Sequence, residues 1–122
     1  MFGMIIRTSS HYGDDTCSSY VSAGDFIYLS HHAGGHESND IVHQMQASFD
    51  SLAATLESAG ATFDDIVQIN LYLKNIKDFS AAKDVFYKYF KKDHFPARMT
   101  TTTDFVNPTC LCMLDAVAYR SS

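Results

Sequence analysis

The chain has 122 residues and a formal net charge of −5. This length suits one domain with one core and is too short for two ordinary domains, so we expect a single domain over residues 1–122. A negative charge with scattered lysines and arginines argues against a nucleic-acid-binding protein. No apolar run approaches the ~20 residues of a membrane span, and the first residues lack a signal-peptide pattern, so no membrane association is expected.

The first part of the chain predicts three short strands. Residues 4–7 form an apolar segment that is typical of a short strand. Residues 20–22 and 26–30 flank the sequence Ala-Gly-Asp at 23–25, which predicts a hairpin. A glycine-containing loop follows at residues 33–39.

Two later segments have the periodicity of amphipathic helices. Asp40 can cap the first helix, and Gly60 suits the left-handed residue that often follows a helix end. The second helix begins at Asp78 or Ser80, and Pro96 prevents its continuation. The apolar positions are Val42, Met45, Phe49, Leu52 and Leu56 in the first, and Phe79, Ala82, Val85, Phe86, Tyr89 and Phe90 in the second.

Three more strands are predicted, at residues 66–73, 98–103 and 110–119. The first of them alternates: Val67, Ile69, Leu71 and Leu73 face one way, and Gln68, Asn70 and Tyr72 the other. Each strand-helix-strand step is a crossover, so part of the sheet should be parallel. The expected fold is therefore α+β, with a six-stranded mixed sheet and two helices on one face.

Two helices can cover only one face of such a sheet. The other face still carries apolar side chains, namely Leu111, Met113, Val117 and Tyr119. An uncovered face of this kind is typical of a surface that binds a partner.

The chain contains three cysteines, and an odd number in a domain of this size suggests reduced thiols and a cytoplasmic protein. Cys110 and Cys112 stand two apart on a predicted strand, about 6–7 Å from each other along it, which is too far for a mutual disulfide. We expect both to be buried as small hydrophobic residues.

Five segments occur in the order and spacing of one protein family. They are GDFIYLS at residues 24–30, AGATFDDIV at 59–67, DF at 78–79, FPAR at 95–98 and DAVA at 115–118. From about Cys17 to Tyr119 the chain resembles the reactive intermediate deaminases, also called RidA-like or YjgF-like proteins. The resemblance implies a chorismate-mutase-like fold and a homotrimer. In that trimer, three sheets form a barrel with a pocket at each subunit boundary.

Arg98 matches the family arginine that binds the substrate carboxylate. It opens a predicted strand after Pro96, where a guanidinium can offer two parallel hydrogen bonds. A surface arginine without a specific contact is the alternative.

The last strand departs from the family. The family motif Glu-x-Glu-Ala-x-Ala supplies the glutamate that orients the attacking water, and residues 113–118 read MLDAVA here. Met113 therefore stands at the catalytic position, and a thioether can neither accept a proton from water nor donate one. Asp115 aligns with the second acidic residue. It is a weak catalytic candidate that could act through a water molecule, and a structural role is the alternative.

Other pocket positions implied by the resemblance also differ. Ser30 and His31 stand where the family has Ser-Gly, Cys17 where a tyrosine is common, and Lys83 where an asparagine is common. The implied substrate-binding set is Arg98, Ser30, His31, Cys17, Lys83, Thr100 and Met113. Cys17 with His31 could form a nucleophile and base, against a thiol in the pocket wall. Lys83 could be a second anion anchor or a Schiff-base amine, against an exposed helix lysine.

No metal and no organic cofactor are expected. Four histidines, at 31, 32, 36 and 43, lack the tighter spacing of most zinc sites. His31 and His32 should also point to opposite faces of a strand, which separates them as ligands.

The resemblance implies binding of a small carboxylate-bearing metabolite and hydrolysis of 2-imino or enamino acids to 2-oxo acids and ammonia. A second hypothesis is a non-catalytic protein of the same fold that binds small ligands or partners and has lost deaminase activity. A ribonuclease or translation inhibitor is a third, which the negative charge disfavours. A fourth is another hydrolase or lyase built on Cys17, His31 and Lys83.

Overall fold

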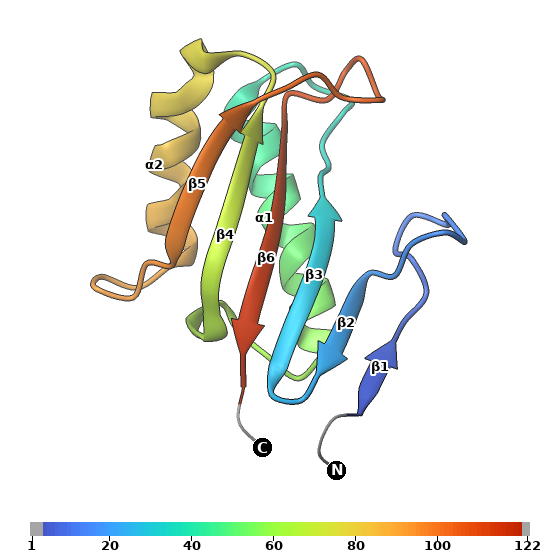
Figure 1. Cartoon of the computed structure of the whole chain (residues 1–122). Helices are drawn as coiled ribbons and strands as arrows, with labels where there is room; N and C mark the ends of the chain where they lie inside the picture. The colour runs from blue at the N-terminus through green and yellow to red at the C-terminus, as the bar shows by residue number, and fades with distance from the viewer. Residues whose placement is uncertain (1–3, 121–122) are drawn as a thin grey trace.

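The computed structural model describes residues 4–120, which form one six-stranded sheet and two α-helices (Figure 1). The strands are β1 (Ile5–Arg7), β2 (Tyr20–Ala23), β3 (Phe26–His32), β4 (Ile66–Leu73), β5 (Ala97–Thr102) and β6 (Cys112–Tyr119). The helices are α1 (Ile41–Ser58) and α2 (Phe79–Tyr89), and single 3-10 turns cover Phe63–Asp65 and Ile76–Asp78. This arrangement confirms the predicted α+β fold.

The strands lie in the order β1-β2-β3-β6-β4-β5. β4 and β5 pair in parallel, because α2 carries the chain back to the starting end of the sheet, and all other neighbours are antiparallel. The crossover through α1 joins β3 to β4, which run in the same direction with β6 inserted between them. The predicted mixed sheet is therefore confirmed, with its one parallel pair at the β5 edge.

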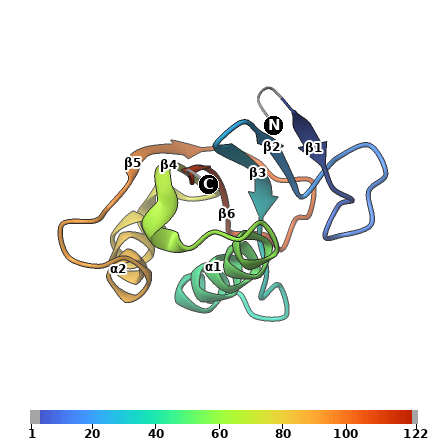
Figure 2. The ribbon, with the colours of Figure 1, turned by 90° about the horizontal axis from the view of Figure 1, so that it is seen from below.

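Both helices lie on the same face of the sheet (Figure 2). Each buries an apolar stripe against the strands, as the periodicity predicted. The buried apolar residues of the stripes are Met45, Phe49, Leu52 and Leu56 in α1, and Ala82, Val85 and Phe86 in α2. Phe49 stands at the centre, where its ring packs edge-on to Phe86 and flat on Tyr89.

The ends of α1 follow the local sequence. The Asp40 carboxylate accepts a hydrogen bond of 2.9 Å from the backbone N–H of His43, which satisfies one of the free amides of the first turn. Gly60 follows the helix end with a φ of +77°, a conformation that glycine adopts without strain. Both predictions for this helix are confirmed, whereas Asp78 precedes α2 without a capping side-chain bond.

Two residues and several strand ends differ from the sequence-based prediction. Val67 is exposed, because a register shift between Ile66 and Gln68 interrupts the alternation of β4. Val42 is also exposed in the first turn of α1. β3 continues beyond residue 30 to its end at residue 32, and β6 begins at residue 112 instead of 110.

β6 shows how the sheet separates its two faces. Cys112, Leu114, Ala116 and Ala118 are buried beneath the helices, and Met113, Asp115, Val117 and Tyr119 alternate with them on the uncovered face. Phe26 and Tyr28 of β3 lie opposite Tyr119 and Val117 in the register, and both rings are more than 40% exposed. The uncovered face therefore presents a continuous apolar patch, which we call the open face: Phe26, Tyr28, Val117 and Tyr119. Within residues 4–120, neither helix combines the length and apolar character needed to cross a bilayer.

The two cysteines at the start of β6 behave as predicted. Cys110 and Cys112 are free thiols with no exposed surface. Burial raises the pKa of both, to about 12 for Cys112. They therefore fill the core as small hydrophobic residues.

His32 is a fully buried polar side chain at the end of β3. Its Nδ1 donates to the carbonyl oxygen of Ser30 at 2.7 Å, so its Nε2 accepts from the Thr55 hydroxyl at 2.8 Å. The ring of His11 stacks on it with centroids 3.9 Å apart. Burial, together with the neighbouring His11 and His31, lowers the pKa of His32 to about 4. The imidazole is thus held neutral, and it fastens the segment around residue 11 to the core.

The His32 imidazole makes stability depend on pH. Its pKa is about 4 in the folded chain and 6.5 when unperturbed, so the unfolded chain binds the extra proton between these values. The free energy of unfolding should therefore fall by about 3 kcal/mol from this residue as the pH drops from 7 to 4. Urea unfolding of wild type and of His32→Leu across that range measures the effect. Parallel pH profiles for the two proteins would contradict it.

Candidate functional site

Arg98 lies on the edge strand β5 and points to the helix side of the sheet. In the β4–β5 register it pairs with Ile69, whose side chain is fully buried beneath the helices. Its Nε donates to the Thr100 hydroxyl at 3.2 Å, and its Cζ lies 5.4 Å from the ring centroids of both Phe79 and Phe86. Contacts with two rings and a hydroxyl hold the guanidinium in place.

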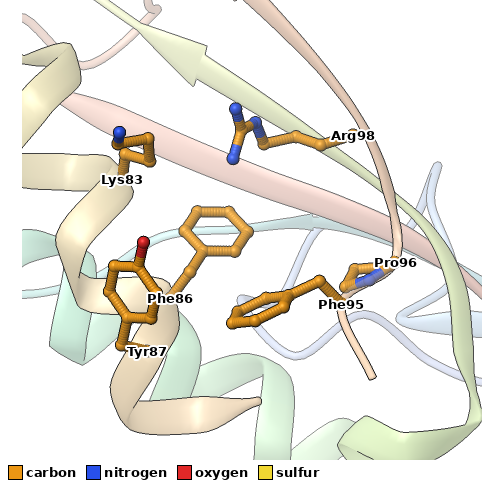
Figure 3. Close-up of a pocket in the computed structure, with 6 residues that line it drawn as sticks. All are labelled: Lys83, Phe86, Tyr87, Phe95, Pro96 and Arg98. Carbon is orange, nitrogen blue, oxygen red and sulfur yellow. The ribbon is translucent and has the colours of Figure 1, made fainter. Parts of the chain in front are cut away.

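A cavity of about 150 Å³ opens beside Arg98, and we call it the arginine cavity. Figure 3 shows its lining residues: Lys83, Phe86, Tyr87, Phe95, Pro96 and Arg98. The charged ends of Lys83 and Arg98 reach the same end of the cavity, above the rings of Phe86 and Phe95 (Figure 3). The structure therefore brings together two of the residues that the sequence analysis proposed for substrate binding.

The arginine cavity is positively charged. The ion pairs of the described chain involve Glu37 and Asp64, and neither Lys83 nor Arg98 takes part in one. Both cations are thus available to an anion that enters from solvent. Arg98 is exposed and Lys83 is half-buried, so solvent reaches both cations.

A second, larger cavity of about 540 Å³ lies on the open side of the sheet around Met113, and we call it the methionine cavity. It is lined by Tyr12, Asp14, His31, Tyr72, Thr103, Asp104, Phe105, Val106, Met113 and Asp115. Three of the proposed residues, His31, Met113 and Asp115, meet here. The cavity combines three carboxylates with an apolar wall.

Asp115 is hydrogen-bonded to its neighbours on β4. Its Oδ1 accepts from the Asn70 amide at 2.7 Å and its Oδ2 from the Tyr72 hydroxyl at 2.7 Å. Burial and this bond to Asp115 raise the pKa of Tyr72, so the phenol stays protonated at neutral pH. Each oxygen of Asp115 thus accepts one hydrogen bond from β4, and these bonds fix the carboxylate, which favours a positioning role over water activation.

The remaining proposed residues are dispersed. Thr100 contacts Arg98, whereas the Ser30 hydroxyl donates to the backbone of Ser19 at 3.1 Å inside the sheet. Cys17 lines a separate groove near residues 7–16, where its thiol donates to the carbonyl oxygen of Ser18 at 3.4 Å.

Cys17 and His31 are not joined by a hydrogen bond in the described chain, and Tyr12 contacts both of them. Its ring centroid lies 5.1 Å from that of His31. The neighbouring Cys17 thiol is the main cause that raises the pKa of Tyr12 to about 12. The structure thus provides no direct nucleophile–base pair from these residues.

The arginine and methionine cavities lie on opposite faces of the sheet. Arg98 and Thr100 pair with buried residues of β4 and therefore face the helices. Met113 pairs with Tyr72, which faces the other side. The two cavities share no lining residue. A single subunit therefore cannot place one small ligand against both Arg98 and Met113.

The sequence matches a family model described as Endoribonuclease L-PSP over residues 13–120, which is nearly the whole chain. A RutC family protein of Saccharolobus solfataricus is 32% identical over 110 residues, covering 85% of this chain and 86% of the relative. The chain belongs to the RidA/YjgF family. A 2-iminobutanoate/2-iminopropanoate deaminase of Dermatophagoides farinae is 34% identical over 89 residues, covering 68% of this chain and 69% of that protein.

Solved structures of the RidA/YjgF family share the fold. A YjgF family member from Neisseria meningitidis superposes with a TM-score of 0.90 at 16% identity, covering 100% of this chain and 99% of that one. The resemblance inferred from the five sequence segments is therefore confirmed at the level of family and fold.

Several cavity residues of this RidA/YjgF chain escaped the sequence analysis. Tyr72 could have been found, because the alternation of β4 already placed it on the face that Met113 occupies. Tyr87 could have been found as well, since it lies one helical turn after Lys83. Tyr12 and Asp14 lie in an irregular segment, where no periodicity shows which way they point.

Among residues 4–120, no group of three or more histidine, cysteine, aspartate or glutamate side chains gathers closely enough to bind a metal ion. His31 and His32 point to opposite faces, as their neighbours Tyr12 and Thr55 show.

Proposed function

We propose that this protein binds small carboxylate-bearing metabolites through Arg98, at subunit boundaries of a homotrimer, and hydrolyses 2-imino acids slowly. In that reaction water adds to the imine carbon and the C–N bond breaks. The products are ammonia and a 2-oxo acid. The observation that carries the proposal is the guanidinium of Arg98, which two rings and Thr100 hold and which has no carboxylate partner among residues 4–120. A relative named as an imine deaminase supports the reaction class.

The separation of the two cavities supports a site shared between subunits. A ligand bound to Arg98 lies on the helix side, and the residues around Met113 lie on the other. A neighbouring subunit can supply the missing wall if its open face packs near the β5 edge. Burial of exposed Phe26, Tyr28 and Tyr119 would provide a driving force for that contact.

A second candidate is a carboxylate-binding protein without deaminase activity. Met113 favours this candidate, because a thioether can neither accept a proton from the attacking water nor donate one. Asp115 stands two residues away on the same face, but both of its oxygens already accept hydrogen bonds. Arg98 has the same binding role in the two candidates, so the difference between them is the rate of hydrolysis.

Arg98→Ala should weaken the binding of small 2-oxo acids by roughly ten- to a hundredfold, since a charge-assisted pair contributes about 1.5–3 kcal/mol. Titration calorimetry with 2-oxobutanoate measures this loss. Arg120→Ala, which removes an exposed arginine outside the arginine cavity, is the matched control and should bind like wild type. Equal affinity of Arg98→Ala and wild type would show that the arginine has no ligand role.

The apolar open face should hold the subunits together. Light scattering of the wild type in dilute buffer should give three times the 13.6 kDa mass of one chain. Tyr28→Glu places a charge on the open face and should dissociate the trimer. Ile76→Glu changes an apolar residue that is 65% exposed in a 3-10 turn, so it should leave the mass unchanged. A monomeric wild type at micromolar concentration would rule out the shared site.

Met113→Glu should accelerate imine hydrolysis, because a positioned proton acceptor typically contributes roughly 10²–10⁴-fold to a rate. Ammonia release from a freshly generated 2-imino acid at neutral pH, corrected for spontaneous breakdown, measures the gain. Ile76→Glu is the control, since Ile76 is an exposed apolar residue outside both cavities. If the wild type already hydrolyses the imine fast and Met113→Glu is no faster, another group orients the water.

A further inference from the structure

The arginine cavity contains two cations from different elements. Lys83 comes from α2 and Arg98 from β5, and their charged ends lie at the same end of the cavity (Figure 3). Both groups also lie over the same ring: Nζ of Lys83 is 6.0 Å and Cζ of Arg98 is 5.4 Å from the centroid of Phe79. They are therefore close enough to contact two ends of one small molecule.

Neither cation is neutralised by the protein. No carboxylate of the described chain lies within the 4.0 Å of an ion pair from Lys83 or Arg98. Two unpaired like charges that line one cavity repel each other, so they favour an occupant with two negative charges over one with a single charge.

The size and the walls limit this occupant. The arginine cavity has a volume of about 150 Å³, comparable to one that holds a benzene ring, and it opens to solvent, so it suits a short molecule. Phe86, Phe95 and Pro96 form an apolar side that suits methylene groups. The Tyr87 hydroxyl, on the same helix as Lys83, adds a hydrogen-bond donor at the polar end (Figure 3).

We propose that the cavity selects short-chain dicarboxylates, with one carboxylate on the guanidinium of Arg98 and the other on the ammonium of Lys83. This inference rests on the proposed function, because it assigns a substrate class to the same site. A dicarboxylate is favoured over a phosphate because the cations belong to separate elements and each can serve its own anionic group. The planar fork of Arg98 also matches a carboxylate.

The test compares two ligands that differ only in the second charge. Glutarate and pentanoate have the same chain length, and calorimetry should find glutarate bound roughly ten- to a hundredfold more tightly by wild type. Lys83→Gln should abolish this preference by weakening glutarate alone, and Lys83→Arg should retain it. Lys88→Gln is the matched control, since Lys88 is an exposed lysine of α2 outside the cavity. Circular dichroism of each variant establishes that it is folded.

Three outcomes would overturn the inference. They are equal affinity of wild type for glutarate and pentanoate, a glutarate preference that survives Lys83→Gln, and inorganic phosphate bound more tightly than glutarate. Arg98→Ala separates these failures from a failure of the proposed function. If it weakens pentanoate and no dicarboxylate preference exists, only the present inference is wrong. If it leaves pentanoate binding unchanged, the proposed function itself is wrong.

Discussion

The covering of the sheet on one face only is the constraint on which the rest of the structure depends. Because side chains alternate along a strand, each residue of β4, β5 and β6 is assigned either to the helix-covered core or to the open side. Leu114 and Ala116 fill the core, and Met113 and Asp115, which alternate with them along β6, cannot. The parallel pairing of β5 on β4 likewise commits Arg98 to the helix side. The chemistry of the chain is thus divided between two surfaces before any ligand is considered.

This division is also one of charge. Lys83 and Arg98 make the arginine cavity positive, while the methionine cavity contains the carboxylates of Asp14, Asp104 and Asp115. Opposite potentials on two surfaces favour contact between copies of the chain in one orientation over the reverse. In the proposed shared site, the same polarity would orient a 2-imino acid, with its carboxylate toward the cations and its nitrogen toward the carboxylates.

The sequence predicted those parts of the fold that short-range patterns determine. The Asp40 cap, the stripe of α1 and the Gly60 turn all follow from residues within a few positions of each other. The predicted face of Val67 is wrong, because a bulge shifts the alternation of the strand by one residue and the pattern of apolar residues does not show it. The stacking of His11 on His32 joins segments that are distant in the sequence, so no local pattern predicts it. For the site, family segments located Arg98 and Met113, but only the structure shows that they face opposite sides.

The two cavities differ in how far along the chain their residues are spread. Most of the arginine cavity comes from α2 and β5, which follow each other directly, so a short loop closure brings its walls together. The methionine cavity joins Tyr12 to Asp115 and needs nearly the whole chain in place. Since loop-closure entropy grows with the length of chain enclosed, the arginine cavity can form while the methionine cavity is still open. During folding, or in a locally opened molecule, the proposed carboxylate anchor can therefore be in place before the surface that Met113 occupies.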